Sequence, residues 1–60
     1  MESKTISEST INGTRVSFYC ISGSPVGDIY IVACQEENKF FGNQNDAKAT
    51  YVRVAKALLS

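Results

Sequence analysis

The chain has 60 residues, of which six are basic and six acidic, so its formal net charge is zero. A chain of this length buries only about 60% of the surface that its unfolded form exposes, which makes one small, marginally stable domain. The chain therefore lacks the excess of basic residues that is typical of a dedicated nucleic-acid-binding protein. No apolar run approaches the ~20 residues of a membrane span, and the N-terminus lacks a signal-peptide core. We therefore expect a cytoplasmic protein that does not enter a membrane.

The first predicted elements are two strands joined by a tight turn. We expect residues 1–3 to be frayed and residues 4–11, rich in Ser and Thr, to form an edge strand. Asn12-Gly13 follows, and this dipeptide favours a type I′ hairpin turn because both residues tolerate a positive φ. The turn would fold residues 4–11 back along residues 14–21.

The central feature is a second hairpin spanning residues 15–35, with the sequence RVSFYCI, the loop SGSPVG and then DIYIVACQ. Strand side chains alternate between faces, so each strand has two possible inner sides. The register that joins the two most apolar sides places Phe18 near Ile31 and Cys20 near Ile29. The alternative is a shift by one residue, which would invert the faces. The predicted core face consists of Val16, Phe18, Cys20, Ile29, Ile31 and Ala33.

The opposite face of the predicted hairpin is also rich in apolar and aromatic side chains. Tyr19 would pair with Tyr30 there, and aromatic cross-strand pairs are favourable by ~0.2–1 kcal/mol. An uncovered apolar surface of this size on a small protein usually marks a binding site. The candidate partner-binding residues are Arg15, Tyr19, Ile21, Tyr30 and Val32, with Ile6 as a further member of the face.

The last third of the chain predicts a helix. Residues 36–39 are polar and turn-like, and Phe40-Phe41-Gly42 is either a short fourth strand or a loop. Asn45 or Asp46 is the predicted N-cap. The helix spans residues 47–59, with a stripe at helical spacing that would face the sheet. That stripe consists of Ala47, Tyr51, Val54, Ala55 and Leu58, and Ala49, Arg53 and Lys56 fall opposite.

These elements predict one α+β domain over residues 1–60. Its sheet is a three-stranded antiparallel meander, or four-stranded if Phe40-Phe41 forms a strand. One C-terminal helix packs on one face, giving the order β-β-β-α. The other face of the sheet is left uncovered.

Catalytic chemistry has little basis in this sequence. The chain has no His, which removes the commonest general base and metal ligand. Cys20 and Cys34 lie on opposite faces in the predicted register, so we expect two reduced thiols, with a disulfide as the alternative. The loop SGSPVG has no Lys and no following helix of the kind a phosphate loop needs. We expect no enzyme activity, no cofactor and no metal.

One family resemblance rests on Phe41-Gly42 followed by Tyr51, Val54, Ala55 and Leu58. In order of elements and in this glycine-to-helix pattern, residues 15–59 resemble the integrase arm-binding and plant ethylene-response-factor type DNA-binding domains. A second, less extensive likeness is to the strand-rich C-terminal part of a double-stranded-RNA-binding domain. The first resemblance implies that the open sheet face enters the DNA major groove, and Arg15 is the residue at such a position here.

The sequence therefore supports two functions in order of preference. The first is a small non-catalytic interaction module, of the size common among phage and plasmid accessory proteins. It would bind a protein partner, or a second copy as a homodimer, through the uncovered face around Tyr19, Tyr30 and Val32. The other surface that could bind a protein is the helix stripe, which Val52 and Leu59 widen. The alternative is nucleic-acid binding through the same face, which would weaken steeply as salt rises, whereas an apolar protein interface would not.

Overall fold

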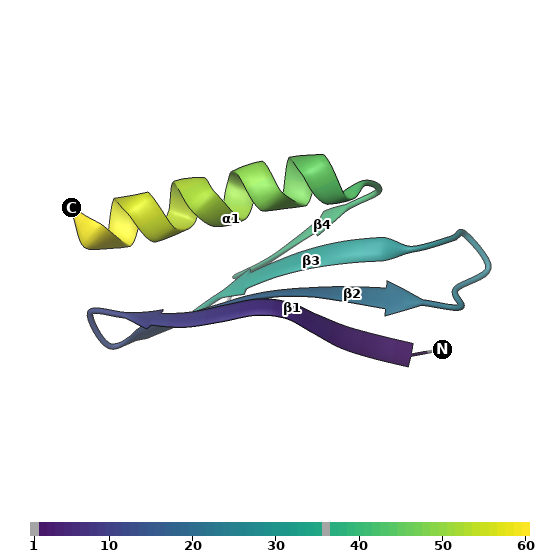
Figure 1. Cartoon of the computed structure of the whole chain (residues 1–60), viewed down its shortest axis with the longest axis horizontal. Helices are drawn as coiled ribbons and strands as arrows, with labels where there is room; N and C mark the ends of the chain where they lie inside the picture. The colour runs from purple at the N-terminus through teal and green to yellow at the C-terminus, as the bar shows by residue number, and fades with distance from the viewer. Residues whose placement is uncertain (1, 36) are drawn as a thin grey trace.

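The computed structural model describes residues 2–35 and 37–60, which form four strands and one helix. The strands are β1 (Glu2–Ile11), β2 (Thr14–Ser22), β3 (Ile29–Cys34) and β4 (Glu37–Phe41), and the helix is α1 (Gln44–Leu59). The sheet order is β1-β2-β3-β4 with antiparallel neighbours, and α1 lies across one face (Figure 1). The predicted α+β meander with a C-terminal helix is confirmed, in its four-stranded form.

The first hairpin forms as the sequence predicts. Asn12 and Gly13 have φ values of 51° and 80°, so both residues of the turn adopt the positive φ that a type I′ turn requires. The strand begins earlier than expected, because Glu2 and Ser3 already pair with β2. The expectation of frayed ends therefore fails for Glu2 and Ser3, and Met1 lies outside the described residues.

The predicted register of the central hairpin is wrong by one residue. Phe18 pairs with Val32, not with Ile31, and Cys20 pairs with Tyr30. The error arose because both sides of β3 are apolar, so the hydrophobic pattern that normally sets register does not distinguish them. The helix side of β3 therefore consists of Tyr30, Val32 and Cys34, whereas Ile29, Ile31 and Ala33 lie on the other side.

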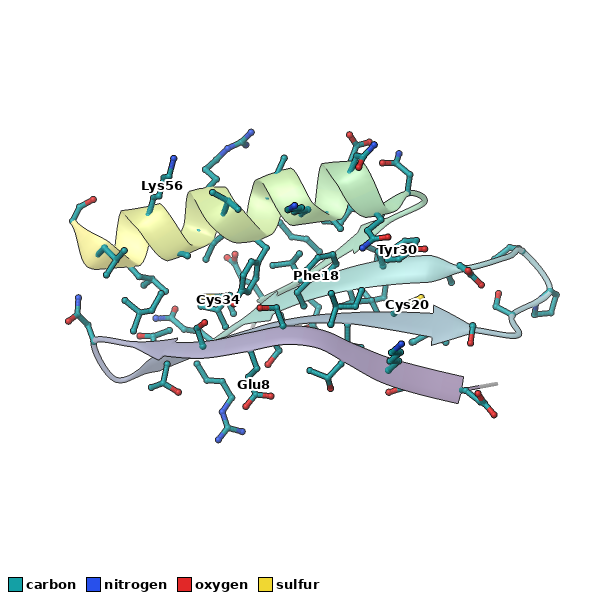
Figure 2. All side chains as sticks on the ribbon, viewed as in Figure 1. Glu8, Phe18, Cys20, Tyr30, Cys34 and Lys56 are labelled. Carbon is teal, nitrogen blue, oxygen red and sulfur yellow. The ribbon has the colours of Figure 1, made fainter. Side chains whose placement is uncertain are left out.

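The core lies between the sheet and α1 and is small. Val16, Phe18, Val32 and Ala47 form one buried cluster. The Phe18 ring lies 5.8 Å from that of Tyr51, centroid to centroid, at a tilt of 33°. Figure 2 shows Phe18 between the two layers. The partly buried side chains around this cluster are Tyr30, Cys34, Phe41, Tyr51, Val54 and Leu58.

The two cysteines share a face, contrary to the prediction. Cys20 pairs with Tyr30 and Cys34 pairs with Val16, so both point to the helix side of the sheet. Both thiols are free and partly buried. They are four residue pairs apart along the ladder, which at about 3.3 Å per residue separates them far beyond disulfide distance.

The sequence did not decide between a fourth strand and a loop at Phe40-Phe41, and the structure has a strand there, β4. This strand also includes the polar residues 37–39, which we expected in a turn. Glu36, also expected there, lies outside the described residues. Phe41 points to the helix side and packs against the core cluster. Phe40, one residue earlier, points to the opposite side, where it pairs with Ile31.

The helix begins earlier than predicted, because Asn43 is the N-cap rather than Asn45 or Asp46. Asp46 N donates to Asn43 Oδ1 at 2.9 Å, and Asn43 Nδ2 donates to Asp46 Oδ2 at 2.9 Å. The predicted apolar stripe does face the sheet, with Thr50 buried beside it. Lys56 points away from the sheet (Figure 2). Within the described chain, α1 is neither long nor apolar enough to cross a membrane.

Candidate interaction surface

The side of the sheet away from α1 carries an apolar patch on β2, β3 and β4. Polar side chains on the same side border it, and they are Ser3, Thr5, Glu8, Thr10, Ser17 and Asn38. The centre of the patch is a row across three strands, in which Tyr19 pairs with Ile31 and Ile31 pairs with Phe40. Ile21 and Ile29 form the next pair along β2 and β3. No described helix or strand covers this side (Figure 1). We call this surface the open sheet face, and its residues are Arg15, Tyr19, Ile21, Ile29, Ile31, Ala33 and Phe40.

Burial on the open sheet face comes from its own side chains. Ile31 is only 2% exposed although no element of the described chain lies over the face, so neighbouring side chains within the face cover it. Tyr19 and Phe40 flank it on the adjacent strands. Phe40 itself remains 65% exposed. The centre of the face is therefore the buried side chain of Ile31, and the exposed aromatic ring of Phe40 lies beside it.

The predicted partner-binding residues divide between the two sides of the sheet. Arg15, Tyr19 and Ile21 lie on the open sheet face, as expected from their place in β2. Tyr30 and Val32 do not, because the one-residue error in register places them under α1, where Val32 is 2% exposed. The expected Tyr19–Tyr30 pair is therefore wrong.

Four residues of the open sheet face were missed as site candidates. Ile29, Ile31 and Ala33 were assigned to the core, and only the shifted register could have identified them. Phe40 carried a clearer signal in the sequence. In a fourth strand, adjacent phenylalanines must point to opposite sides, so one of Phe40 and Phe41 had to lie away from the helix.

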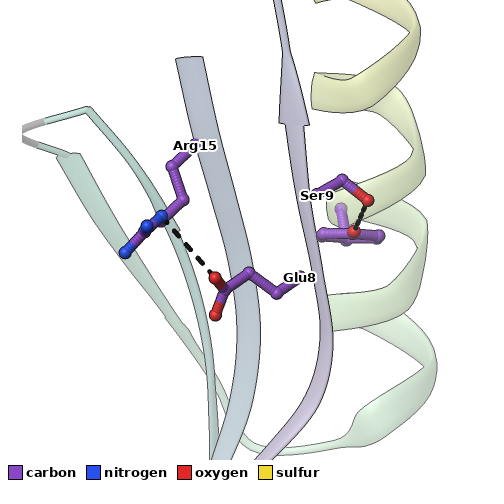
Figure 3. Close-up of polar contacts among 4 residues, drawn as sticks. Glu8, Ser9 and Arg15 are labelled. Atoms are coloured by element: carbon purple, nitrogen blue, oxygen red, sulfur yellow. Dashed lines mark hydrogen bonds and ion pairs between the residues drawn. The ribbon is translucent and has the colours of Figure 1, made fainter. Parts of the chain in front are cut away.

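The end of the open sheet face next to the Asn12-Gly13 turn is polar and carries one positive and one negative side chain. Arg15 Nε lies 3.6 Å from Glu8 Oε1, and both side chains are largely exposed. Figure 3 shows this pair on one side of β1, while Ser9 points to the helix side. Exposed pairs of this kind contribute ~0.2–1 kcal/mol. Arg15 is therefore partly neutralised and does not make the face cationic.

Ile6 belongs to a different surface from the one predicted. A bulge between Thr5 and Ser7 interrupts the alternation of β1. Ile6 lines a shallow groove of about 240 Å³ between β1 and α1, together with Phe18, Tyr51 and Val52. Ser7, Gln44 and Lys48 also line this β1–α1 groove, so it is a mixed polar and apolar surface on the helix side of the sheet.

The titratable residue Tyr30 lies on the helix side of the sheet. Partial desolvation raises the pKa of the Tyr30 hydroxyl, and the nearby Cys20 and Asp28 raise it further. No three His, Cys, Asp or Glu side chains of the described residues cluster closely enough to hold a metal ion.

Comparison with known proteins adds no family to this description. No protein-family model matches the chain, and neither a curated protein nor a solved structure matches it significantly. The architecture stands as a four-stranded antiparallel meander followed by a C-terminal helix.

Proposed function

We propose that this protein is a small, non-catalytic interaction module that binds a protein surface through the open sheet face. The observation that supports this most strongly is Phe40, which is 65% exposed at the end of an apolar row formed with the partly exposed Tyr19 and the buried Ile31. No described helix or strand covers this row. Aromatic side chains of this kind are enriched at the energetic centres of protein interfaces. Contiguous exposed apolar patches are rare on proteins that act alone.

Nucleic-acid binding through the same face is the alternative, suggested by the resemblance to integrase arm-binding domains. Reading bases in the major groove requires Arg, Lys, Asn or Gln side chains that point into it. On the open sheet face as defined, Arg15 is the cationic member, and it is paired with Glu8. An apolar patch whose one arginine is paired with Glu8 favours a protein partner over a phosphate backbone.

Site-specific photocrosslinking in the cells that express the protein tests this function. The photoreactive residue p-benzoylphenylalanine replaces Phe40 in one variant and Leu59, at the end of α1, in a matched control. Both native side chains are large, apolar and well exposed, at 65% and 70%. We expect position 40 to give a discrete adduct that contains protein, and position 59 to give none.

The dependence of the crosslink on salt concentration then distinguishes protein binding from nucleic-acid binding. For a protein partner, the yield of the adduct at position 40 should be similar at about 50 mM and about 500 mM salt, because apolar contacts are not screened. An adduct with nucleic acid that is lost over this range would instead support phosphate contacts. Equal crosslinking at positions 40 and 59 would overturn the assignment of the face.

A further inference from the structure

We propose that Asn12 is a site of spontaneous deamidation, and that the carboxylate formed there releases the C-terminal end of α1 from the β1–β2 turn. Deamidation is a reaction of the peptide chain itself and consumes only water. Asn12 is suited to it because its side chain precedes a glycine and donates the hydrogen bond that joins this turn to the helix. One reaction at one residue would therefore change how the sheet and the helix are connected.

The reaction is an internal substitution followed by hydrolysis. The backbone nitrogen of Gly13 attacks Asn12 Cγ, the bond from Cγ to Nδ2 breaks, and the amide group leaves as ammonia with the proton that the Gly13 nitrogen loses. Solvent water then opens the resulting cyclic imide. Opening at the side-chain carbonyl gives aspartate, and opening at the backbone carbonyl gives isoaspartate, in which the main chain runs through the former side chain.

The residue that follows Asn12 distinguishes it from the other asparagines. Gly13 has no side chain to obstruct attack by its own nitrogen. Apart from its chain neighbours, no atom lies within 4 Å of the position that a Cβ would take there. Both residues of the turn are exposed, so water reaches them. Asn38, Asn43 and Asn45 are also exposed, but they precede lysine, glutamine and aspartate, whose side chains hinder the same attack.

The folded chain restrains the amide that must leave. Asn12 Nδ2 donates to the Leu58 carbonyl at 2.6 Å. This carbonyl belongs to the last turn of α1, where backbone oxygens have no partner within the helix. Asn12 also holds a φ of 51° in the turn. A side chain fixed in this way cannot turn its Cγ freely towards the Gly13 nitrogen, so the reaction should follow opening of the contact with Leu58.

The contact with Leu58 lies in the part of α1 that opens most readily. Helix ends fray at little cost in free energy, without unfolding of the core. Leu59, the last residue of α1, is 70% exposed. Nearer the middle of the helix, the Tyr51 hydroxyl lies 2.9 Å from Ser9 Oγ, which joins α1 to β1 by a separate contact. The end of the helix can therefore leave the turn while the middle stays in place.

Deamidation would replace an attractive contact with a repulsive one. A carboxylate at position 12 has no hydrogen to donate. It also places a negative charge against the Leu58 carbonyl, at the negative end of the helix dipole. Isoaspartate further lengthens the main chain within a turn whose geometry depends on the positive φ of Asn12 and Gly13. Neither product returns to asparagine, so the release of the helix end is permanent.

Peptide mapping by mass spectrometry measures deamidation of the purified, folded chain during weeks of storage at physiological temperature and pH. We expect aspartate and isoaspartate to accumulate at Asn12 while Asn38, Asn43 and Asn45 stay intact. Asn12→Gly keeps the positive φ of the turn and removes the reactive amide, so it is the control in which no product forms. An intact Asn12, or earlier product at another asparagine, would overturn the site.

Two neighbouring leucines test whether the helix end restrains the reaction. Leu58→Ala removes a partly buried side chain that packs against the core, so deamidation at Asn12 should accelerate by about tenfold. Leu59→Ala shortens an exposed side chain and should leave the rate unchanged. Circular dichroism verifies folding, and Leu58→Val, with a smaller acceleration, replaces Leu58→Ala if that variant is unfolded. Equal rates at positions 58 and 59 would overturn the restraint.

Hydrogen exchange followed by NMR measures the release of the helix end. Ion-exchange chromatography separates the deamidated chain, which carries one more negative charge, from the fresh chain. In the deamidated chain the backbone amides of residues 56–59 should exchange about fivefold faster, the change expected for one lost hydrogen bond. The Tyr51 amide should keep its rate, and Asn12→Asp should reproduce both results. Unchanged exchange at residues 56–59 would overturn the release.

Discussion

The hydroxyl of Tyr51 lies 2.9 Å from the Oγ of Ser9, which joins the middle of α1 to β1 (Figure 3). Ser7 Oγ donates to the same Tyr51 oxygen at 3.2 Å. Most of β1 is exposed, and α1 packs mainly over β2 and β3. Polar contacts therefore hold this edge strand under the helix where apolar packing is sparse.

We expect Tyr51→Phe to lower the free energy of unfolding by about 1 kcal/mol, because it keeps the ring but removes the shared hydroxyl. Urea denaturation measures the change. Combining Tyr51→Phe with Ser9→Ala should cost about 0.5 kcal/mol or more less than the sum of the single changes, since both remove the same contact. Strictly additive effects would contradict the contact.

Val32→Ala should cost about 2 kcal/mol of unfolding free energy, because Val32 is 2% exposed in the core beneath α1. Val26→Ala, the same change at an 82% exposed position in the β2–β3 loop, should cost less than about 0.5 kcal/mol. Thermal and chemical denaturation of the two variants compare them directly. Equal costs would mean that the observed register of β3 is wrong.

The N-cap gives a matched pair of asparagines for substitution. Asn43→Ala should destabilise the chain by about 1 kcal/mol, since its side chain satisfies the backbone amide of Asp46. Asn45→Ala should be nearly neutral, because Asn45 is exposed within the first turn of α1 and alanine favours helix. Denaturation followed by circular dichroism at 222 nm, the ordinary helix signal, would show the difference. The reverse order would support the cap predicted from sequence.

Asn12 acts both in the first hairpin turn and at the end of α1. Its Nδ2 donates to the Leu58 carbonyl at 2.6 Å. Asn12→Gly keeps the positive φ and loses only the donor, so we expect a cost of about 0.5–1 kcal/mol. Asn12→Asp should cost about 1–2 kcal/mol, because it also places a negative charge at the negative end of the helix dipole. An Asn12→Asp variant as stable as wild type would contradict this contact.

Alkaline pH should destabilise the fold through Tyr30. Its pKa is raised above the ordinary 10.0 in the folded chain, so the fold favours the protonated phenol. The unfolded chain loses this proton first, so stability is fully present below about pH 10 and falls as pH rises through the folded pKa. Denaturation between about pH 8 and about pH 11 should show a shallower decline for Tyr30→Phe than for wild type. Identical slopes would contradict the raised pKa.

Features that depend on neighbours in the chain were predictable from the sequence. Asn12-Gly13 specifies its turn because both residues accept a positive φ, and the turn fixes how β1 meets β2. The stripe from Ala47 to Leu58 specifies the inner face of α1 because its spacing follows the helical period. These local rules were enough for the α+β meander and for the place of Arg15, Tyr19 and Ile21 on β2.

The tertiary structure alone decided which side of β3 meets the helix. β3 is a central strand with apolar side chains on both sides, so alternation along the chain carries no information about its orientation. Packing of α1 over Val32, and pairing of β4 with β3, make that choice and send Ile31 and Phe40 to the open sheet face. The sequence by itself thus determined that an apolar sheet face is left over. Only long-range packing decided which residues form it, because the two registers differ in their contacts with the rest of the chain and not in their local pattern.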